Sequence, residues 1–417
     1  MWAVVREPSF ALLWVAGLIS SVGDWLLFVA LPFYVYQHTG STLATGALFL
    51  AQMAPSLLLG SVAGVFVDRW DRRRTMVAVD LARALLLPVL LTVHGRGDLP
   101  RVYAVAFLLA ALGQFFGPAK GALLPRLVAS ASLLPANGLT ALGDNLPRLV
   151  GPALGGLLFG ARGLPGAVLA DSASFLASGL LLAAIRVPAA TPARPATTPT
   201  HRTGAASVWR EWRDGLRAVG ADRVARTLLA VEGVAIVGQG ILDVLLVPFI
   251  RGVMHGDAQA FGWLLTVQAI GGLLGALVVA RRGAILAPAR LFGLSLGANG
   301  VLLAAIAHAP ALPLIFALIA IAGVPVVGWL VGGQTLLQQS VTDRYRGRLY
   351  GAYGTTSALT RLSGMGLASI AGDRVGVVPL LTAAGGLHIA AAVGALVLLR
   401  ATSPPHTEAD GITVKPG

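Results

Sequence analysis

Long apolar stretches recur along almost the whole chain. Hydropathy places twelve of them at about 10–36, 44–66, 75–94, 101–122, 136–161, 164–186, 224–250, 260–280, 289–308, 311–334, 349–371 and 376–399. Each is near the roughly 20 residues that a helix needs to cross the hydrocarbon layer of a membrane. Because a backbone within lipid must satisfy its own hydrogen bonds, these stretches predict helices rather than strands. The sequence therefore predicts an all-α membrane protein with twelve transmembrane helices.

The composition argues against other classes of protein. Only 12% of the 417 residues are charged, whereas an average soluble chain has about 25%. The absence of cysteine removes thiolate nucleophiles, disulfides and cysteine-ligated metals. An ATP-driven pump would need GxxxxGK[ST] and a zinc protease HExxH, and neither motif occurs. We therefore expect no cofactor, no metal site and no enzymatic activity.

The basic residues are distributed unevenly between the expected loops. If the N-terminus is cytoplasmic, 22 of the 31 Lys and Arg residues fall in inner segments and five in outer loops. Such a positive-inside bias sets the orientation of membrane proteins. We expect a multi-pass protein of the bacterial inner or plasma membrane with both termini in the cytoplasm. The net charge of +13 then reflects topology, and no nucleic-acid partner is expected.

The chain divides once, near its middle. Residues 188–204 are rich in Pro, Thr and Ala, which is typical of a flexible linker. Apolar residues then recur at helical spacing in 207–220, with arginines on the other face. This pattern fits a helix on the inner membrane surface or a solvated helix. The expected organisation is an N-terminal bundle (1–187), a cytoplasmic linker (188–223), a C-terminal bundle (224–401) and a cytoplasmic tail (402–417).

The two bundles repeat each other in parallel. PRLVGPALGG (147–156) matches TRLSGMGLAS (360–369) at an offset of 213 residues, and LPF (31–33) matches VPF (247–249) at 216. The end of the second span, GVFVDRWDRRR, corresponds at an offset of 211 to GALVVARR. Several matches at a nearly constant offset indicate two six-helix units. Parallel repeats are typical of transporters whose binding site lies between the halves.

Two motifs resemble those of a known family. The stretch Gly64-x-x-x-Asp68-Arg69-x-x-Arg72-Arg73 resembles the loop 2–3 signature of the major facilitator superfamily. The stretch Arg148-x-x-Gly151-Pro152-x-x-Gly155-Gly156 resembles the helix 5 motif of its drug:proton antiporters. Segments 20–41, 116–128 and 343–351 resemble the twelve-helix branch that contains macrolide-efflux and enterobactin-exporter types. The resemblance implies two pseudo-symmetric six-helix bundles, the major facilitator fold, in a monomeric transporter.

The resemblance also implies roles for the loop after the second span. Asp68 would bond across to helix 11 while Arg69 and Arg72 hold neighbouring helix ends, so that this loop acts as a gate. Alternatively, the arginines only fix the topology. Two positions depart from the family pattern. Asp71 replaces a turn glycine, which Asp tolerates, and Pro147 replaces the first glycine of the helix 5 motif, where it removes a backbone donor.

Ionisable residues within the spans are the sharpest functional signal. A charge at mid-bilayer costs about 2.5–3.5 kcal/mol on insertion scales, so such residues usually face a partner or a hydrated cavity. The candidates for proton coupling or substrate contact are Asp24, Asp144, Arg148, Glu232, Asp243 and Arg361. Asp144 and Arg148 are spaced to pair on one helix face, and so are Asp80 and Arg83.

The candidates differ in their expected partners. Asp24 has no partner nearby in sequence, so we expect it to carry a coupling proton, to contact a substrate cation, or to form a structural hydrogen bond. Arg361 would bind an anionic group or pair with an acid of the other half. Asp171 would cap or orient its helix, and His388 fits a satisfied interior histidine.

The expected function is proton-coupled efflux of a hydrophobic drug-like molecule, a secondary metabolite or a siderophore, by alternating access. Its partners would be the small-molecule substrate, protons and the lipid bilayer. The alternatives are a proton-coupled importer, a lipid flippase on the same fold, or a sensor that uses the fold without transport.

Overall fold

The computed structural model describes residues 2–187, 223–340 and 346–399, and these form helices with short connections. The first helices are α1 (Trp2–Val5), α2 (Pro8–Thr39), α3 (Thr42–Arg69), α4 (Arg72–Leu86), η1 (Leu87–Thr92), η2 (Arg96–Asp98), α5 (Leu99–Leu127), η3 (Ser130–Ser132) and α6 (Leu133–Ala184). The others are α8 (Arg223–Pro248), η4 (Phe249–Val253), α9 (Ala258–Arg282), η5 (Gly283–Ile285), α10 (Pro288–Ala307), α11 (Leu312–Ser340), α12 (Arg346–Val375) and α13 (Val377–Leu398). The all-α membrane class is confirmed.

The helix count agrees with the expected number of spans. Ten helical stretches of the described part are long and apolar enough to cross a membrane. One of them contains α6, whose 52 residues are interrupted at Gly163 by a left-handed backbone conformation (φ 63°, ψ −161°). This break lies between the expected spans 136–161 and 164–186, so α6 comprises two crossings. Helix α12 has 30 residues and is more polar; with it, the described helices are consistent with twelve crossings.

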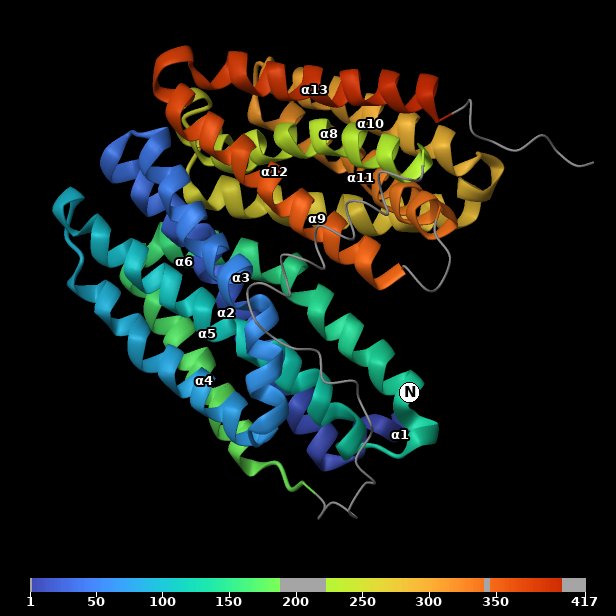
Figure 1. Cartoon of the computed structure of the whole chain (residues 1–417). Coiled ribbons are helices and arrows are strands. Elements are labelled where there is room, and N and C mark those ends of the chain that lie inside the picture. The colour runs from blue at the N-terminus through green and yellow to red at the C-terminus, as the bar shows by residue number, and fades with distance from the viewer. Residues whose placement is uncertain (1, 188–222, 341–345, 400–417) are drawn as a thin grey trace, which may run out of the picture.

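The helices pack in two groups, one on each side of the undescribed residues 188–222 (Figure 1). In the first group α2 packs along α6, and α3 and α4 both pack on α5. In the second group α10 packs on α11 and α13, α9 on α11, and α8 on α12 and α13. The expected linker helix at 207–220 and the tail at 402–417 lie outside the described residues.

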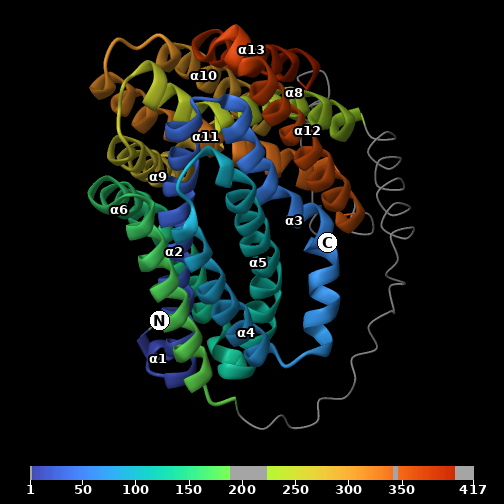
Figure 2. The ribbon, with the colours of Figure 1, turned by 90° about the vertical axis from the view of Figure 1, so that its left-hand side faces the viewer.

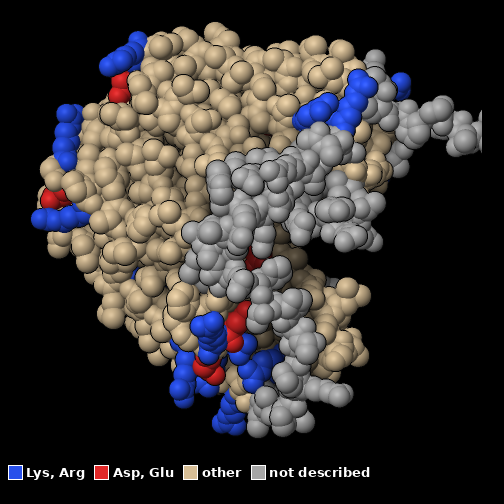
Figure 3. All heavy atoms as spheres, viewed as in Figure 1, with Lys and Arg blue, Asp and Glu red and all other residues tan. Residues whose placement is uncertain are grey.

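The two groups meet at one end of the molecule. We call the end that carries loops 68–74 and 281–290 the basic end, and the other the distal end. Helices α3 and α12 lie side by side toward the distal end (Figure 2). There the Thr42 backbone N–H and Ser41 Oγ both donate to the carboxylate of Asp373, and each donor–acceptor distance is 2.7 Å. A hollow separates the groups toward the basic end (Figure 3).

The buried apolar side chains follow the same division. One cluster contains members of both groups, including Phe33 near the distal end of α2 and Phe249 at the start of η4, which follows α8 directly. Two further clusters belong to one group each and lie toward the basic end, around Phe10 and around Phe292. The halves therefore share a core at the distal end and have separate cores at the basic end.

Candidate functional site

A cavity of about 550 Å³ lies between the two groups of helices. Such a volume is in the range of about 300–1,000 Å³ that is typical of small-molecule sites. Apolar and aromatic side chains from both groups form much of its lining, among them Trp25, Phe28, Phe49, Leu242, Phe261 and Leu265. Three glutamines, Gln52, Gln239 and Gln268, add neutral hydrogen-bonding groups. The cavity can therefore hold a largely apolar molecule with a few polar anchors.

An acid and an arginine from the first group form one charged wall of this cavity. Asp24 lies in the middle of α2, and its Oδ1 is 3.8 Å from Nη1 of Arg83 on α4. Arg83 also donates through Nη2 to the carbonyl of Leu109 on α5 (3.1 Å), and its guanidinium lies 5.0 Å from the ring centroid of Phe175. The arginine is thus held by three helices, while the Asp24 carboxylate reaches the cavity.

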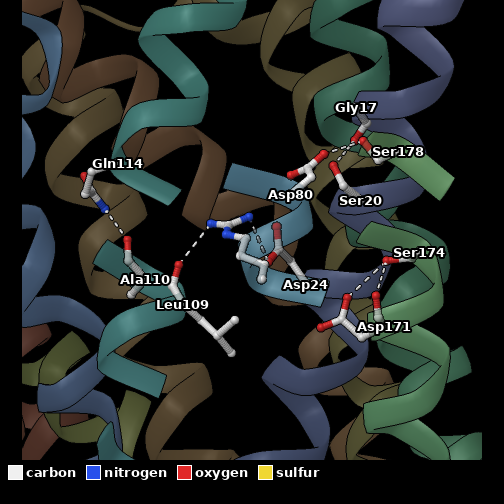
Figure 4. Close-up of polar contacts among 11 residues, drawn as sticks. Gly17, Ser20, Asp24, Asp80, Leu109, Ala110, Gln114, Asp171, Ser174 and Ser178 are labelled. Atoms are coloured by element: carbon white, nitrogen blue, oxygen red, sulfur yellow. Dashed lines mark hydrogen bonds and ion pairs between the residues drawn. The ribbon is translucent and has the colours of Figure 1, made fainter. Parts of the chain in front are cut away.

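Two further acids lie near this pair, and one of them, Asp171, also lines the cavity. Asp80 on α4 and Asp171 on α6 are fully buried, and they surround the same region as Asp24 (Figure 4). Ser178 donates to Asp80 Oδ2 (2.5 Å), and Ser174 donates to Asp171 Oδ1 (3.1 Å). Within the described part, the other oxygen of each carboxylate has no hydrogen-bond partner. Three carboxylates therefore lie in one region of the first group (Figure 4).

A second acid and arginine form the charged wall on the other side. Arg361 on α12 donates through Nε to Oδ2 of Asp243 on α8 (2.6 Å), and Gln239 donates to Oδ1 of the same carboxylate (3.1 Å). All three residues line the cavity. The cavity therefore has an acid–arginine pair on each side, and each pair joins two helices of one group.

Several expected pairings are wrong. Asp144 pairs with Lys120 of α5 (2.7 Å) and not with Arg148, which is exposed. Asp80 accepts from a serine, and Arg83 pairs with Asp24, which the sequence left without a partner. These partners lie on different helices and meet because the helices pack against one another. The spacing of residues along a single helix does not show such contacts.

Arg361 also differs from its expected pairing. Its acid partner, Asp243, belongs to the same group of helices rather than to the other half. Neither Asp144 nor Arg148 lines the cavity. Asp24, Asp243 and Arg361 are thus the three candidates that the structure brings to one site.

Glu232 and His388 are buried away from the cavity, in the second group. Tyr353 donates to Glu232 Oε1, and Oε2 has no hydrogen-bond partner among the described residues. The His388 ring lies against Trp329, and its Nδ1 is 2.9 Å from the carbonyl of Ala384. A role for Glu232 in coupling stays a prediction.

The contacts of the loop between α3 and α4, at the basic end, differ from those expected. Asp71 caps α4 by accepting from the backbone N–H of Arg74 (2.8 Å), so the acid that replaces a glycine has a structural use. Arg73, rather than Arg69, holds a neighbouring helix end by donating to the carbonyls of Ala183 and Ile185. Asp68 is exposed.

Two further residues of the loop motif, Gly64 and Arg72, lie near the junction of α3 with α4. Arg72 donates to the carbonyl of Asp68 in the preceding helix (3.1 Å). A Cβ added at Gly64 would have no heavy atom from outside its own helix within 4 Å in the described part of the chain. The start of helix 11, where Asp68 would bond, falls at 341–349, outside the described side chains, so this gate remains a prediction.

The glycines of the helix 5 motif lie at close helix contacts. A Cβ at Gly151 would lie 2.4 Å from Trp25 Cβ, and a Cβ at Gly155 would lie 3.0 Å from Leu26 Cα. Both of these neighbours are on α2. A Cβ at Gly156 would lie 2.5 Å from the carbonyl oxygen of Ala258 on α9, in the other group. The backbone of α6 stays helical through Pro147 and Pro152. The motif thus forms a tight seam within the first group and between the groups.

Sequence reasoning missed part of the site. Gln52 and Gln268 line the cavity, and neither was a candidate for the site. Arg83 lines it as well, but this basic residue, which is of a kind rare within spans, was expected only to pair with Asp80. That rarity is a signal that could have selected it.

Comparison with known proteins identifies the family. A family model described as transmembrane secretion effector matches residues 1–414. The chain belongs to this family of the major facilitator superfamily. It is therefore a membrane transporter, and the resemblance of the loop 2–3 and helix 5 motifs is confirmed at the level of the family.

Relatives and solved structures agree with this assignment. The chain is 31% identical to the multidrug efflux pump Tap of Mycolicibacterium fortuitum over 89% of this chain and 91% of that protein. It is 25% identical to macrolide efflux protein A of Streptococcus pyogenes over 88% and 90%. A bacterial homologue of the iron transporter ferroportin, in an inward-facing state, has the same fold, with a TM-score of 0.73 and 18% identity over 94% and 99% of the two chains.

Proposed function

We propose that this transporter exports hydrophobic drug-like molecules in exchange for protons. The observation that carries the proposal is the largely apolar cavity between the groups, with an acid–arginine pair in each wall. Ionisable groups at membrane depth are costly and mark ion or substrate pathways. The efflux relatives, which include Tap and macrolide efflux protein A, support the outward direction and a drug-like cargo.

Alternating access follows from the way the halves meet. With the basic end in the cytoplasm, as the distribution of arginines favours, the described arrangement is open toward the cytoplasm and closed at the distal end. Cargo would enter the cavity in this state. Separation of the distal contacts, with closure of the basic end, would then release it outside.

Asp24 is the proposed carrier of the coupling proton. A proton that enters from outside binds the Asp24 carboxylate and neutralises it, which removes its attraction for the Arg83 guanidinium. Arg83 can then rely on the carbonyl of Leu109 and on the ring of Phe175. When the basic end reopens, the proton leaves to the cytoplasm and the ion pair forms again. One proton thus moves inward as cargo moves outward.

The test uses the purified full-length protein in liposomes with an imposed pH gradient and a fluorescent ethidium-like dye. We expect dye movement against its own gradient, accompanied by counter-movement of protons that a pH-sensitive dye records. Dye flux that ignores the gradient would contradict proton coupling. Gradient-driven uptake in the proton's own direction would indicate an importer, and lipid movement without a soluble cargo would indicate a flippase.

A further inference from the structure

The two walls of the cavity differ in which partner of each ion pair they expose. In the first group the Asp24 side chain is 55% exposed, whereas Arg83 is 9% exposed. In the second group the order is reversed, because Arg361 is 43% exposed and Asp243 is 16% exposed. A molecule in the cavity therefore meets a carboxylate on the wall of α2 and a guanidinium on the wall of α12.

The exposed groups also keep bonding capacity for a ligand. Asp24 is 3.8 Å from Arg83, longer than a hydrogen bond. Arg361 bonds Asp243 through Nε, and the described contacts of this arginine leave its terminal Nη groups free. The buried partners are occupied, since Arg83 donates to Leu109 and Asp243 accepts from Gln239 as well. Ligand charges of opposite sign can thus bind at opposite walls.

We propose that the cargo of this cavity is zwitterionic, an aromatic or otherwise apolar molecule with a cationic group at one end and an anionic group at the other. The cationic group pairs with Asp24 and the anionic group with the Nη atoms of Arg361. The apolar body lies between them against Trp25, Phe28 and Phe261. This inference rests on the proposed export function and narrows its substrate class.

A singly charged molecule fits the cavity less well. It satisfies one wall and gives the exposed charge on the other wall no partner beyond that of its own ion pair. A charged group removed from water without a partner is costly, whereas a charge-assisted hydrogen bond recovers that cost. The zwitterion should therefore bind more tightly than either singly charged form of the same skeleton, by about tenfold.

A matched set of three fluoroquinolones tests this. Ciprofloxacin is zwitterionic at neutral pH, its methyl ester is a cation and its N-acetyl derivative is an anion. The measurement is equilibrium binding of each compound to the purified full-length protein in lipid nanodiscs, by fluorescence anisotropy of the quinolone. We expect the zwitterion to bind about tenfold more tightly than the other two. Equal affinities, or no binding by any of the three, would overturn the inference.

Variants assign each charge to its wall. Asp24→Asn should weaken the zwitterion and the ester and leave the N-acetyl compound unchanged, whereas Arg361→Gln should weaken the zwitterion and the N-acetyl compound only. Asp24→Glu and Arg361→Lys keep the charges and should keep the preference. Asp98→Asn and Arg101→Gln remove the same charges from a partly exposed ion pair at the start of α5, away from the cavity, and serve as controls. Losses that are equal for all three compounds would contradict the assignment.

The binding test and the transport test fail in different ways. If dye export in liposomes is driven by protons but the three quinolones bind alike, the export function stands and the zwitterion inference falls. If the preference holds but no proton-driven export occurs, the proposed function falls and the charge assignment of the cavity stands.

Discussion

At the scale of single residues, the proposed proton coupling depends on an ion pair between α2 and α4. Asp24 faces the cavity, and Arg83 is held behind it by a backbone carbonyl and an aromatic ring. Asp80 and Asp171 place two further carboxylates near Asp24 (Figure 4). A change in the charge of Asp24 therefore alters the surroundings of a buried arginine that connects three helices.

Asp24→Asn tests this pair. The amide cannot accept the coupling proton, so we expect proton-driven dye efflux to be lost while membrane insertion and folding are retained. The measurements are efflux from loaded liposomes with a pH gradient and the elution profile of the purified variant. Asp98→Asn, which removes a surface carboxylate near the distal end of α5, should behave as wild type. Normal coupled efflux by Asp24→Asn would exclude Asp24 as the proton carrier.

The sequence identified charged residues of the cavity better than it predicted their partners. Asp24, Asp243 and Arg361 stood out because charges are rare within apolar spans. The partners were wrong for Asp144 and Asp80, since spacing along one helix shows only the neighbours on that helix. The pairing of Asp24 with Arg83 depends on how α2 packs beside α4, and a single sequence carries no signal of that contact.

At the scale of elements, the seam between α6 and α9 joins the two groups through close contact between backbones. A Cβ on Gly262 of α9 would lie 2.2 Å from the carbonyl oxygen of Pro152, and Thr266 donates to the carbonyl of Leu149 (2.9 Å). Close approach of backbones at small residues is typical of helix pairs in membranes. The helix 5 motif therefore supplies contact between the halves as well as within one of them.

Gly156→Ala should disturb this seam. The added methyl group would lie 2.5 Å from the carbonyl oxygen of Ala258, and such overpacking typically costs about 1–3 kcal/mol. We expect slower dye export and a lower thermal unfolding temperature of the purified protein. The matched control is Gly160→Ala one turn later, where nothing lies within 4 Å of the added atom. Equal effects of the two substitutions would contradict a specific role of the seam.

A second contact between elements joins α12 to the start of α3. Asp373 accepts from Ser41 Oγ, from the backbone N–H of Thr42 and from Thr42 Oγ1 (2.8 Å), so it caps a helix of the other group. Asp373→Ala should loosen the distal end, which a label pair at the exposed residues Leu43 and Val375 would report as a broader distance distribution.

The control for that substitution is another helix cap. Asp257 accepts from the backbone N–H of Ala260 (2.7 Å) and caps α9 within its own group. Loss of an N-cap costs about 0.5–2 kcal/mol, so both alanine variants should lose some stability. Only Asp373→Ala should alter the distance between the groups. The same change in both variants would indicate general loosening rather than loss of a contact between halves.

The contact at Asp373 should persist in acid. Partial burial alone would raise the pKa of Asp373, but hydrogen bonds from Thr42 and Ser41 outweigh it and lower the pKa below the ordinary value of 3.8. A group with a lowered pKa stabilises its contact above the ordinary pKa, and the contribution is lost as the pH falls through the lowered value. The label distance between 43 and 375 should therefore be constant from about pH 8 to pH 5 if Asp373 alone controls it. A transition centred between these values would mean that another group titrates.

Most of the helices could be predicted because their signal is strong and local. A span such as 10–36 corresponds to α2 (Pro8–Thr39), and the short connection near 163 was found between two apolar runs. Which end of the bundle is open could not be predicted, since both arrangements of the halves would use the same spans. The shared core around Phe33 and Phe249 contains that information.

At the scale of the whole molecule, the central claim is that the two groups rotate about the cavity between them. They share one apolar core at the distal end, whereas each has its own at the basic end. Separate cores allow the basic ends to move apart or together without exposing the interior of either group. Opening of the distal end would separate the parts of the shared core that the two groups contribute and would break the hydrogen bonds of Asp373 with Ser41 and Thr42.

The most direct test measures both ends in the same protein. The chain has no cysteine, so spin labels can be placed on Leu134 and Ile285, two exposed residues at the basic end, and in a second sample on Leu43 and Val375 at the distal end. Pulsed electron paramagnetic resonance then gives each distance with and without a pH gradient and dye. We expect the distance at the basic end to shorten and the distance at the distal end to lengthen under the same conditions. Two distances that change in the same direction, or a distal end that stays closed during dye export, would contradict it.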